Sequence, residues 1–465
     1  MPSQHKPIKP NGERPTGISN TAEESARVSS RRGNRRGASA STVSRMEQII
    51  QSFVRNKQFM GTVLVARGNK IILDKGYGFA NLEWGISNSP KTKFRLGSLT
   101  KQFTAAAILL LGERGRLDVS DSVMKHMPEA PSQWNAITLF HLLTQTSGIP
   151  NFTAFADYVS LKHIPATPDQ LVQRFRDKPL EFQPGEKWSY SNSGYVLLGY
   201  LIERICGQSY AQFIQQNLFK PLSMVRSGYD SNSAIIQNRA SGYAPDRSGL
   251  LNADYIHMAV PLSAGGLYST TWDLLRWQRA LFSGKVLSSV ALEQMTTPFK
   301  DAYAFGLAVR TENGTEVIEH GGGIEGFNAM LAYYPKSKLT VIVLGNVSGS
   351  APQEIADYLG VLALGGNVVL ASERKSIRVD PGTLDRYVGA YRLDPNFSIE
   401  ITRQEDRLFG QASGQPQFEI FAETDKEYFL KAFGARITFV TGKQGWATEL
   451  ILHQRGIHRR AKRVE

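Results

Sequence analysis

Hydrophobic positions near the start of the chain recur with two different spacings. Apolar residues three and four positions apart, among them Ile49, Ile50 and Phe53, predict a helix over residues 44–57. Two β-branched runs on either side of a Gly-Asn pair then predict a β-hairpin over residues 62–73. The chain therefore begins its folded part with a helix followed by two paired strands.

Helical spacing returns over residues 98–113 and continues, interrupted by Pro and Gly, from about 120 to 300. A β-pattern follows in four segments, and a last helix is predicted over 351–363; the four segments are 303–309, 316–320, 330–334 and 339–344. Strands at both ends of a helical middle are typical of a mixed sheet assembled from the two ends of a domain. The predicted class is α+β.

The pattern changes again after a charged stretch with a Pro-Gly breaker, which predicts a linker over residues 367–383. Beyond it, short alternating segments recur at even spacing, at 397–401, 407–410, 419–421, 428–430, 437–439 and 449–452. Such spacing is typical of a small antiparallel barrel or sandwich. We expect this second domain to cover residues 384–455, after a main domain over 46–366.

The net charge of +13 lies mostly at the two ends of the chain. Residues 1–45 hold nine Lys or Arg against three Asp or Glu, and residues 455–465 hold five against one. We interpret residues 1–45 and 456–465 as basic tails, the first of them disordered. Basic tails can contact nucleic acid or an anionic membrane, but the N-terminal one lacks aromatic residues for stacking on bases, so no nucleic-acid partner is predicted.

Cys206 is the single cysteine, which excludes an intrachain disulfide. We interpret it as a small buried hydrophobe on a helix rather than a reactive thiol. No apolar run is long enough to span a bilayer, and the first residues lack the apolar stretch of a secretory signal. A cytoplasmic location is the resulting default expectation.

Three short motifs carry the chemistry of the chain: Ser98-Leu99-Thr100-Lys101, Tyr190-Ser191-Asn192 and His320-Gly321-Gly322. Three residues apart on a helix, Ser98 and Lys101 share one face, so the amine can take the proton that the hydroxyl must lose before it attacks a carbonyl. The same spacing also starts at Ser3, Ser122 and Ser372, so the prediction depends on the three motifs together.

In this order, the three motifs resemble those of the serine β-lactamase and penicillin-binding protein superfamily. The segments 94–97, 141–150 and 190–195 strengthen the likeness, which covers roughly residues 46–365. It is strongest to the branch of class C β-lactamases, D-aminopeptidases, D-alanyl-D-alanine carboxypeptidases and esterases, peptidase family S12. The resemblance implies the β-lactamase/transpeptidase-like fold, with helices around an antiparallel sheet. The opening of the second domain, residues 384–391, is similar to lipocalin-like C-terminal modules of this branch.

Site roles follow from the resemblance. Ser98 would be the nucleophile, and either Lys101 or Tyr190 would activate it; for Lys101 this needs a pKa far below the usual 10.4. Asn192 and Gly322 would bind substrate, and the backbone amides of Ser98 and Gly323 would form the oxyanion hole. A core role for Tyr190 and a turn-forming role for Asn192 are the structural alternatives.

His320 is where the sequence departs from the superfamily, since β-lactamases and many penicillin-binding proteins have a lysine there that attracts a substrate carboxylate. A histidine is mostly neutral at pH 7 but still donates a hydrogen bond, so we assign His320 to substrate binding. The change favours the peptidases and esterases of the branch over its β-lactamases.

We therefore predict a serine hydrolase that cleaves amides or esters through an acyl-enzyme, of the D-aminopeptidase or D-alanyl-D-alanine carboxypeptidase type. A carboxylesterase, a class C-like β-lactamase and a penicillin sensor without turnover stay open. No cofactor or metal is expected, because no Cys/His/Asp cluster has metal-ligand spacing. The expected partner is a small molecule or short peptide, and oligomerisation is left open. Members of the resembling superfamily often work in the periplasm or outside the cell.

Overall fold

The structure is a computed structural model that describes residues 40–247, 249–312, 314–395, 397–431, 435–454 and 457–464. Most of the predicted N-terminal tail, residues 1–39, lies outside the described residues.

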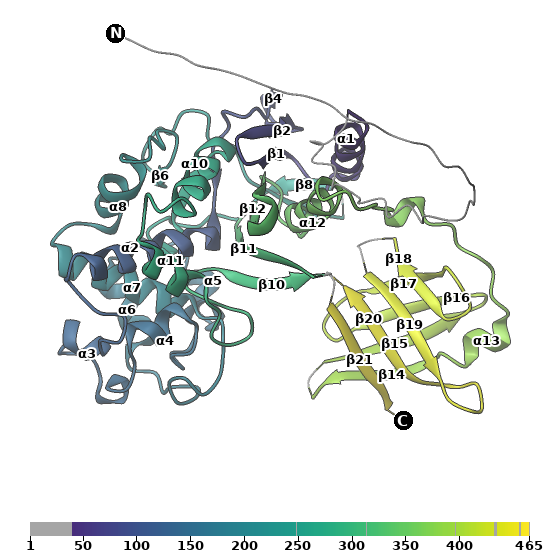
Figure 1. The fold of residues 1–465 in the computed structure, drawn as a ribbon. Helices are drawn as coiled ribbons and strands as arrows, with labels where there is room; N and C mark the ends of the chain where they lie inside the picture. Colours follow the sequence, from purple (N-terminus) through teal and green to yellow (C-terminus); the bar gives the residue numbers. More distant parts are fainter. Residues whose placement is uncertain are drawn as a thin grey trace, which may run out of the picture. The chain divides into compact units, whose positions relative to one another are not determined.

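A six-stranded antiparallel sheet forms the centre of the main domain (Figure 1). Its strands, in spatial order, are β10 (Ala308–Glu312), β11 (Thr315–Ile324), β12 (Phe327–Tyr334), β13 (Leu339–Gly345), β1 (Gly61–Arg67) and β2 (Lys70–Tyr77). Both faces are covered, because Val63 and Val65 of β1 pack into one core cluster while Leu64 packs into the other. This double burial explains the continuous apolar runs of the central strands.

Two helices from the ends of the main domain cover one face of the sheet, α1 (Ala40–Arg55) and α12 (Ala351–Ala363). The bounds of α12 agree with the prediction. Helix α1 begins four residues before the predicted helix and so extends into the segment expected to be a tail. Its buried side chains are Met46, Ile49, Ile50 and Phe53, the apolar stripe that predicted the helix.

The other face packs against the helical part of the domain, whose largest elements are α2 (Lys101–Glu113) and α7 (Asn192–Cys206). The remaining helices are α3 (Val123–His126), α4 (Leu139–Leu143), α5 (Tyr158–Leu161), α6 (Pro168–Arg176), α8 (Tyr210–Ile214), α9 (Leu262–Gly265), α10 (Thr271–Leu281) and α11 (Ser289–Thr296). Short helical turns are η1 (Gly97–Thr100), η2 (Ser132–Trp134), η3 (Phe152–Ala154), η4 (Gln215–Phe219), η5 (Pro335–Ser337) and η6 (Ala371–Glu373).

A small three-stranded sheet carries the segments that lead into the site. Strand β9 (Leu267–Ser269) pairs with both β5 (Phe94–Arg95) and β6 (Gly228–Tyr229). Two hairpins complete the main domain: β3 (Phe79–Asn81) with β4 (Ile86–Ser87), and β7 (Tyr243–Asp246) with β8 (Gly249–Asn252).

The strand predicted over 303–309 is wrong in position, because β10 begins only at Ala308. Gly306 has φ +67° and interrupts the extended backbone. A Cβ at this position would lie 2.6 Å from the backbone oxygen of Lys101, so the segment turns where it meets α2. Its apolar side chains are buried in that turn rather than in a strand.

The C-terminal domain is a closed antiparallel barrel, which confirms the predicted fold class (Figure 1). Its strands are β14 (Gly389–Asp394), β15 (Phe397–Gln404), β16 (Arg407–Ala412), β17 (Gln417–Ala422), β18 (Glu427–Leu430), β19 (Ala435–Thr441), β20 (Ala447–Gln454) and β21 (Ile457–Val464). A cluster of aromatic rings packs inside it, with Tyr387 stacked on Phe439 at 4.3 Å between ring centroids. Helix α13 (Pro381–Asp385) begins within the predicted linker.

The basic tail predicted over residues 456–465 is instead the strand that closes the barrel. Strand β21 pairs with β20 along Glu449–Gln454 and with β14 at Ala390–Arg392. Ala461 is fully buried, whereas Arg460 and Lys462 are exposed. Backbone hydrogen bonds to β20 and β14 hold this closing strand, so its side chains need not alternate between apolar and polar. In the sequence its charged residues therefore resemble a tail.

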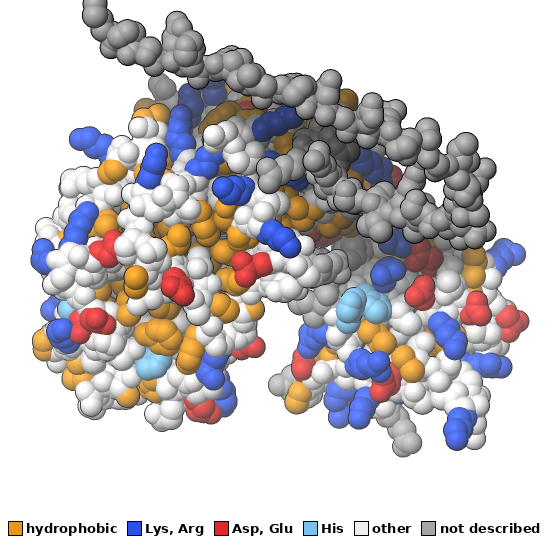
Figure 2. Space-filling view, in the orientation of Figure 1, with side chains coloured by type: hydrophobic (Ala, Val, Ile, Leu, Met, Phe, Trp, Pro, Cys, Tyr) orange, Lys and Arg blue, Asp and Glu red, His pale blue; other side chains and the backbone are white. Residues whose placement is uncertain are grey.

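No helix among the described residues is long and apolar enough to cross a membrane. On the face drawn in Figure 2, Lys and Arg side chains are scattered among Asp and Glu rather than gathered in one patch.

The closing strand leads to a stability test. We expect Ala461→Asp to lower the stability of the barrel by about 3 kcal/mol or more, because it buries a charge without a partner. The exposed neighbour Lys462→Gln should stay within about 0.5 kcal/mol of the native protein. Urea unfolding followed by near-UV circular dichroism measures both, and an unchanged Ala461→Asp midpoint would contradict the closing role of β21.

Candidate active site

Ser98 lies in the tight turn η1, directly before α2, where two backbones approach each other. Strand β5 delivers this turn, and the amide of Leu96 donates to the carbonyl of Leu267 at 2.8 Å. Gly97 has φ +51°, and a Cβ there would lie 2.7 Å from the backbone oxygen of Gly323. Glycine at 97 therefore allows both the turn and its contact with β11.

The amine of Lys101 is the centre of the site. Its Nζ lies 3.1 Å from Ser98 Oγ, 2.8 Å from Asn192 Oδ1 and 2.9 Å from the carbonyl oxygen of Ala264. Lys101 is fully buried, and the ring centroid of Tyr190 lies 4.8 Å from Nζ. The structure thus brings together Ser98, Lys101, Tyr190 and Asn192, as the motifs predicted.

Burial lowers the pKa of Lys101 well below its usual value. A neutral amine has two N–H donors and one lone pair. Two of its three neighbours here are carbonyl oxygens that only accept, from Asn192 and Ala264. In the neutral form both N–H groups can point at these two oxygens, which leaves the lone pair facing the third neighbour, the Ser98 hydroxyl. The geometry therefore fits a general base directed at Ser98.

Tyr190 differs from Lys101 in its protonation. Burial raises the pKa of Tyr190 above its usual value, and a hydrogen bond with Ser98 opposes that rise only in part. A phenol that keeps its proton at neutral pH is a donor or a relay rather than the initial base. The electrostatics therefore favour Lys101 of the two candidates.

Asn192 is held in place by side chains from two nearby loops. Its backbone amide donates to Asn151 Oδ1 at 3.1 Å, and its side-chain Nδ2 donates to Thr153 Oγ1 at 3.1 Å. Gln145, with φ +61°, accepts from the amide of Ser191 at 2.9 Å through Oε1. The side-chain oxygen of Asn192 is thereby directed at Lys101.

Strand β11 forms the opposite wall of the site. Its partner β10 pairs with it only as far as Glu319, so residues 320–324 continue along an edge of the described sheet. A Cβ at Gly322 would lie 1.9 Å from the carbonyl oxygen of Leu96. Gly322 is thus required for the close contact between β11 and the turn before Ser98, a packing reason that the motif alone does not indicate.

His320 is buried and bonded on both ring nitrogens. Nδ1 lies 2.5 Å from the carbonyl oxygen of Gly321 and must carry the proton, so Nε2 accepts from the Tyr303 hydroxyl at 3.0 Å. Burial lowers the pKa of His320 to about 4, so the ring is neutral at pH 7. Its direct contact with substrate stays a prediction, since its contacts are with the protein.

A cavity of about 360 Å³ opens over Ser98. Gly97, Asn192, Thr153 and Gly323 line it together with apolar side chains and Glu325; the apolar ones include Phe152, Tyr158, Ile256, Pro261 and Ile324. Glu325 is the one lining side chain with a formal charge among the described residues of this cavity. Lys162 Nζ holds it at 2.9 Å and also binds Asp254 at 2.7 Å.

Several residues of the site lay outside the predicted set. Gln145 lies in the segment 141–150, which carries only the family likeness, and Thr153 lies in a loop beyond that segment. The carbonyl of Ala264 has no sequence signal, because any residue supplies a backbone oxygen. Glu325 lies three residues after Gly322, where the third motif ends, and this position is the signal in the sequence that points to it.

No group of three or more His, Cys, Asp or Glu side chains able to hold a metal occurs in the part of the chain that the structure describes.

Comparison with known proteins agrees with this geometry. Residues 46–365 match the Beta-lactamase family, and residues 373–462 match a domain of unknown function, DUF3471, which includes most of the closing strand β21. The chain belongs to the Beta-lactamase family and is a serine hydrolase of the β-lactamase and penicillin-binding protein superfamily, S12 branch.

The match with each of three similar proteins covers most of that protein's length. Penicillin-binding protein 4* of Bacillus subtilis is 28% identical over 90% of this chain and 98% of its own. The structure of an octameric penicillin-binding protein homologue from Pyrococcus abyssi matches with TM-score 0.66 and 26% identity, over 90% of this chain and 100% of its own. A D-stereospecific amidohydrolase from Streptomyces sp. matches with TM-score 0.57 and 26% identity, over 65% and 94%.

The close packing of β11 leads to a paired test. We expect Gly322→Ala to cost about 1–3 kcal/mol or more and to lower kcat/KM at least about 10-fold, because the methyl group overlaps a backbone oxygen that cannot move alone. Gly321→Ala is the matched control, since its nearest atoms lie at 3.6 Å. Thermal unfolding and hydrolysis assays compare the two; equal behaviour of both variants would refute the packing argument.

Proposed function

We propose that the protein hydrolyses amides of amino acids or short peptides that carry a free amino group, through an acyl-enzyme on Ser98. The observation that carries this proposal is the buried Lys101 amine 3.1 Å from Ser98 Oγ, whose pKa is lowered by burial, in a cavity whose charged lining side chain is the carboxylate of Glu325.

Acylation begins when Lys101 Nζ accepts the Ser98 proton and Oγ bonds to the substrate carbonyl carbon. The carbonyl oxygen becomes an anion, which the backbone amides of Ser98 and Gly323 would stabilise. Collapse of this intermediate breaks the amide bond, and the leaving amine takes the proton from Lys101, with Tyr190 as the relay. Water then repeats the sequence on the acyl-enzyme and releases the acid.

The charge of the cavity favours an ammonium group over a carboxylate. Glu325 lies in the lining, while the neutral His320 is buried in contacts with the protein and does not line this cavity. Substrates of β-lactamases and carboxypeptidases bring a carboxylate, which needs a cation to pair with. This charge pattern disfavours the carboxypeptidase included in the main prediction and the β-lactamase alternative, and it leaves the esterase alternative compatible with the same acyl-enzyme route.

The similarity to a D-stereospecific amidohydrolase supports amide cleavage, and the penicillin-binding protein homologues support acylation of the serine. The side chains of Ser98, Lys101 and Tyr190 are all present and lie together. This arrangement supports an enzyme that turns over rather than a sensor that is acylated once.

The protonation of Lys101 sets the expected pH dependence. Because the protonated amine has no lone pair, kcat/KM should rise with pH as Lys101 loses its proton and reach a plateau well below 10.5. Lys101→Arg, which stays protonated, should lose at least about 10³-fold at every pH, as Ser98→Ala should. The profile is measured on the fastest substrate among D- and L-alanine p-nitroanilides and p-nitrophenyl acetate. Full activity of Ser98→Ala on all of them would reject the proposal.

Glu325 provides the test of the substrate class. We expect Glu325→Gln to raise KM about 10-fold for alanine p-nitroanilide, because a charge-assisted hydrogen bond to the ammonium is lost. The N-acetylated substrate lacks that charge and should be hydrolysed equally by both proteins.

Glu293→Gln, on the exposed surface of α11, is the control for removal of a carboxylate elsewhere. If Glu325→Gln lowered the hydrolysis of both substrates equally, the carboxylate would have a structural role and the proposed preference for a free amine would be wrong.

A further inference from the structure

A second cavity, of about 370 Å³, lies beside the one over Ser98 and shares Ile256 and Glu325 with it. We call it the side chamber. Its charged lining residues are Arg95, Arg239, Asp254 and Glu325. Neither the motifs nor the proposed chemistry at Ser98 uses its arginines.

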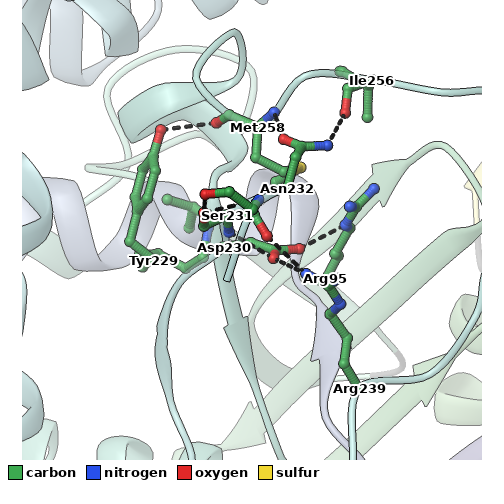
Figure 3. Close-up of polar contacts among 11 residues, drawn as sticks. Arg95, Tyr229, Asp230, Ser231, Asn232, Arg239, Ile256 and Met258 are labelled. Carbon is green, nitrogen blue, oxygen red and sulfur yellow. Dashed lines mark hydrogen bonds and ion pairs between the residues drawn. The ribbon is translucent and has the colours of Figure 1, made fainter. Parts of the chain in front are cut away.

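The arginine side of the chamber carries an excess positive charge. Asp230, which is fully buried, accepts from Arg95 Nε at 2.6 Å and from Arg239 Nη1 at 2.5 Å (Figure 3). Two guanidinium groups thus share one carboxylate. Among the described residues, the two terminal nitrogens of Arg95 have no hydrogen-bond partner, so they are available to a ligand.

The opposite side carries an excess negative charge. Lys162 Nζ binds both Asp254 and Glu325, so two carboxylates share one ammonium. The hydrogen bond from Lys162 lowers the pKa of Asp254, which keeps that carboxylate ionised at neutral pH. Asp254 is largely exposed and can contact a ligand that enters from solvent.

The wall between the two cavities is fixed by hydrogen bonds rather than by packing alone. Asn232 Nδ2 donates to the carbonyl of Ile256 at 3.1 Å, and the amide of Met258 donates to Asn232 Oδ1 at 2.7 Å (Figure 3). The hydroxyl of Tyr229 donates to the carbonyl of Met258 at 2.8 Å. The backbone at Ile256, which lines both cavities, is therefore held by a defined framework.

We propose that the side chamber binds the zwitterionic form of an amino acid or short peptide, with the carboxylate at Arg95 and Arg239 and the ammonium at Asp254 and Glu325. An anion alone would also face the two carboxylates, and a cation alone would face the two guanidinium groups. A ligand with one charge of each sign pairs with both excess charges. The proposal goes beyond the proposed function, because it requires no reaction at Ser98.

The test uses full-length Ser98→Ala protein, which prevents turnover, and three probes of the same backbone. Glycylglycine carries both charges, N-acetylglycylglycine only the carboxylate and glycylglycinamide only the ammonium. Isothermal titration calorimetry should give at least about 10-fold tighter binding for glycylglycine than for either capped probe. Equal affinities, or no binding of glycylglycine, would reject the proposal.

Variants then assign the binding to the side chamber. In the same protein, Arg239→Gln should weaken glycylglycine about 10-fold and leave glycylglycinamide unchanged, whereas Asp254→Asn should weaken both. Arg276→Gln is the matched control: Arg276 also bonds a fully buried aspartate, Asp273 at 2.6 Å, but lines neither cavity.

The variants also separate this proposal from the proposed function. Asp254 is exposed, so Asp254→Asn keeps the test valid if Arg239→Gln fails to fold. Suppose that the affinity for glycylglycine falls in Glu325→Gln but not in Arg239→Gln or Asp254→Asn. The probe would then lie in the cavity over Ser98. That outcome would overturn the side chamber and leave the amine preference at Ser98 standing.

Discussion

The arrangement of the site depends on one constraint, the burial of the Lys101 amine without a carboxylate partner. A charged ammonium in this position would have to give up its hydration for neutral dipoles only, so the neutral form is favoured. Its hydrogen bonds then require two fixed acceptors and one donor. The acceptors come from Asn192 and Ala264, which lie far apart in the chain, so two distant segments meet at one amine.

The second constraint is steric and acts between backbones. The turn that presents Ser98 touches β11 so closely that Gly97 faces Gly323 and Gly322 faces the carbonyl of Leu96. Side chains at 97 or 322 would push the strand and the turn apart, and with them the two amides expected to bind the oxyanion. The three-stranded sheet of β5, β9 and β6 fixes the other side of the same turn. The position of Ser98, the proposed nucleophile, and the electrostatics around it thus have separate structural origins.

The sequence predicted those parts that depend on local pattern. Helix α12 and the central strands follow from apolar spacing, and the cluster of Ser98, Lys101, Tyr190 and Asn192 follows from short motifs, because each pattern is determined within a few neighbouring residues. Strand β21 escaped prediction, since its pairing with β14 links residues seventy or more positions apart and Ala461 is the one buried residue among positions 458–464. The Ala264 carbonyl and the Asp230 pair of arginines are likewise products of the tertiary fold, which residue types alone do not specify.

The separation between reaction and selectivity follows from where the charges lie. The groups proposed to move protons at Ser98 are buried, and they belong to the three sequence motifs. Ionised groups occupy the outer walls, on Glu325 and on the arginines and carboxylates of the side chamber, outside those motifs. These charged groups do not contact the Lys101 amine. They can therefore change which substrate is bound without altering the pKa of Lys101. Proteins that share one acylation chemistry can therefore bind different substrates when the charged residues lining their cavities differ.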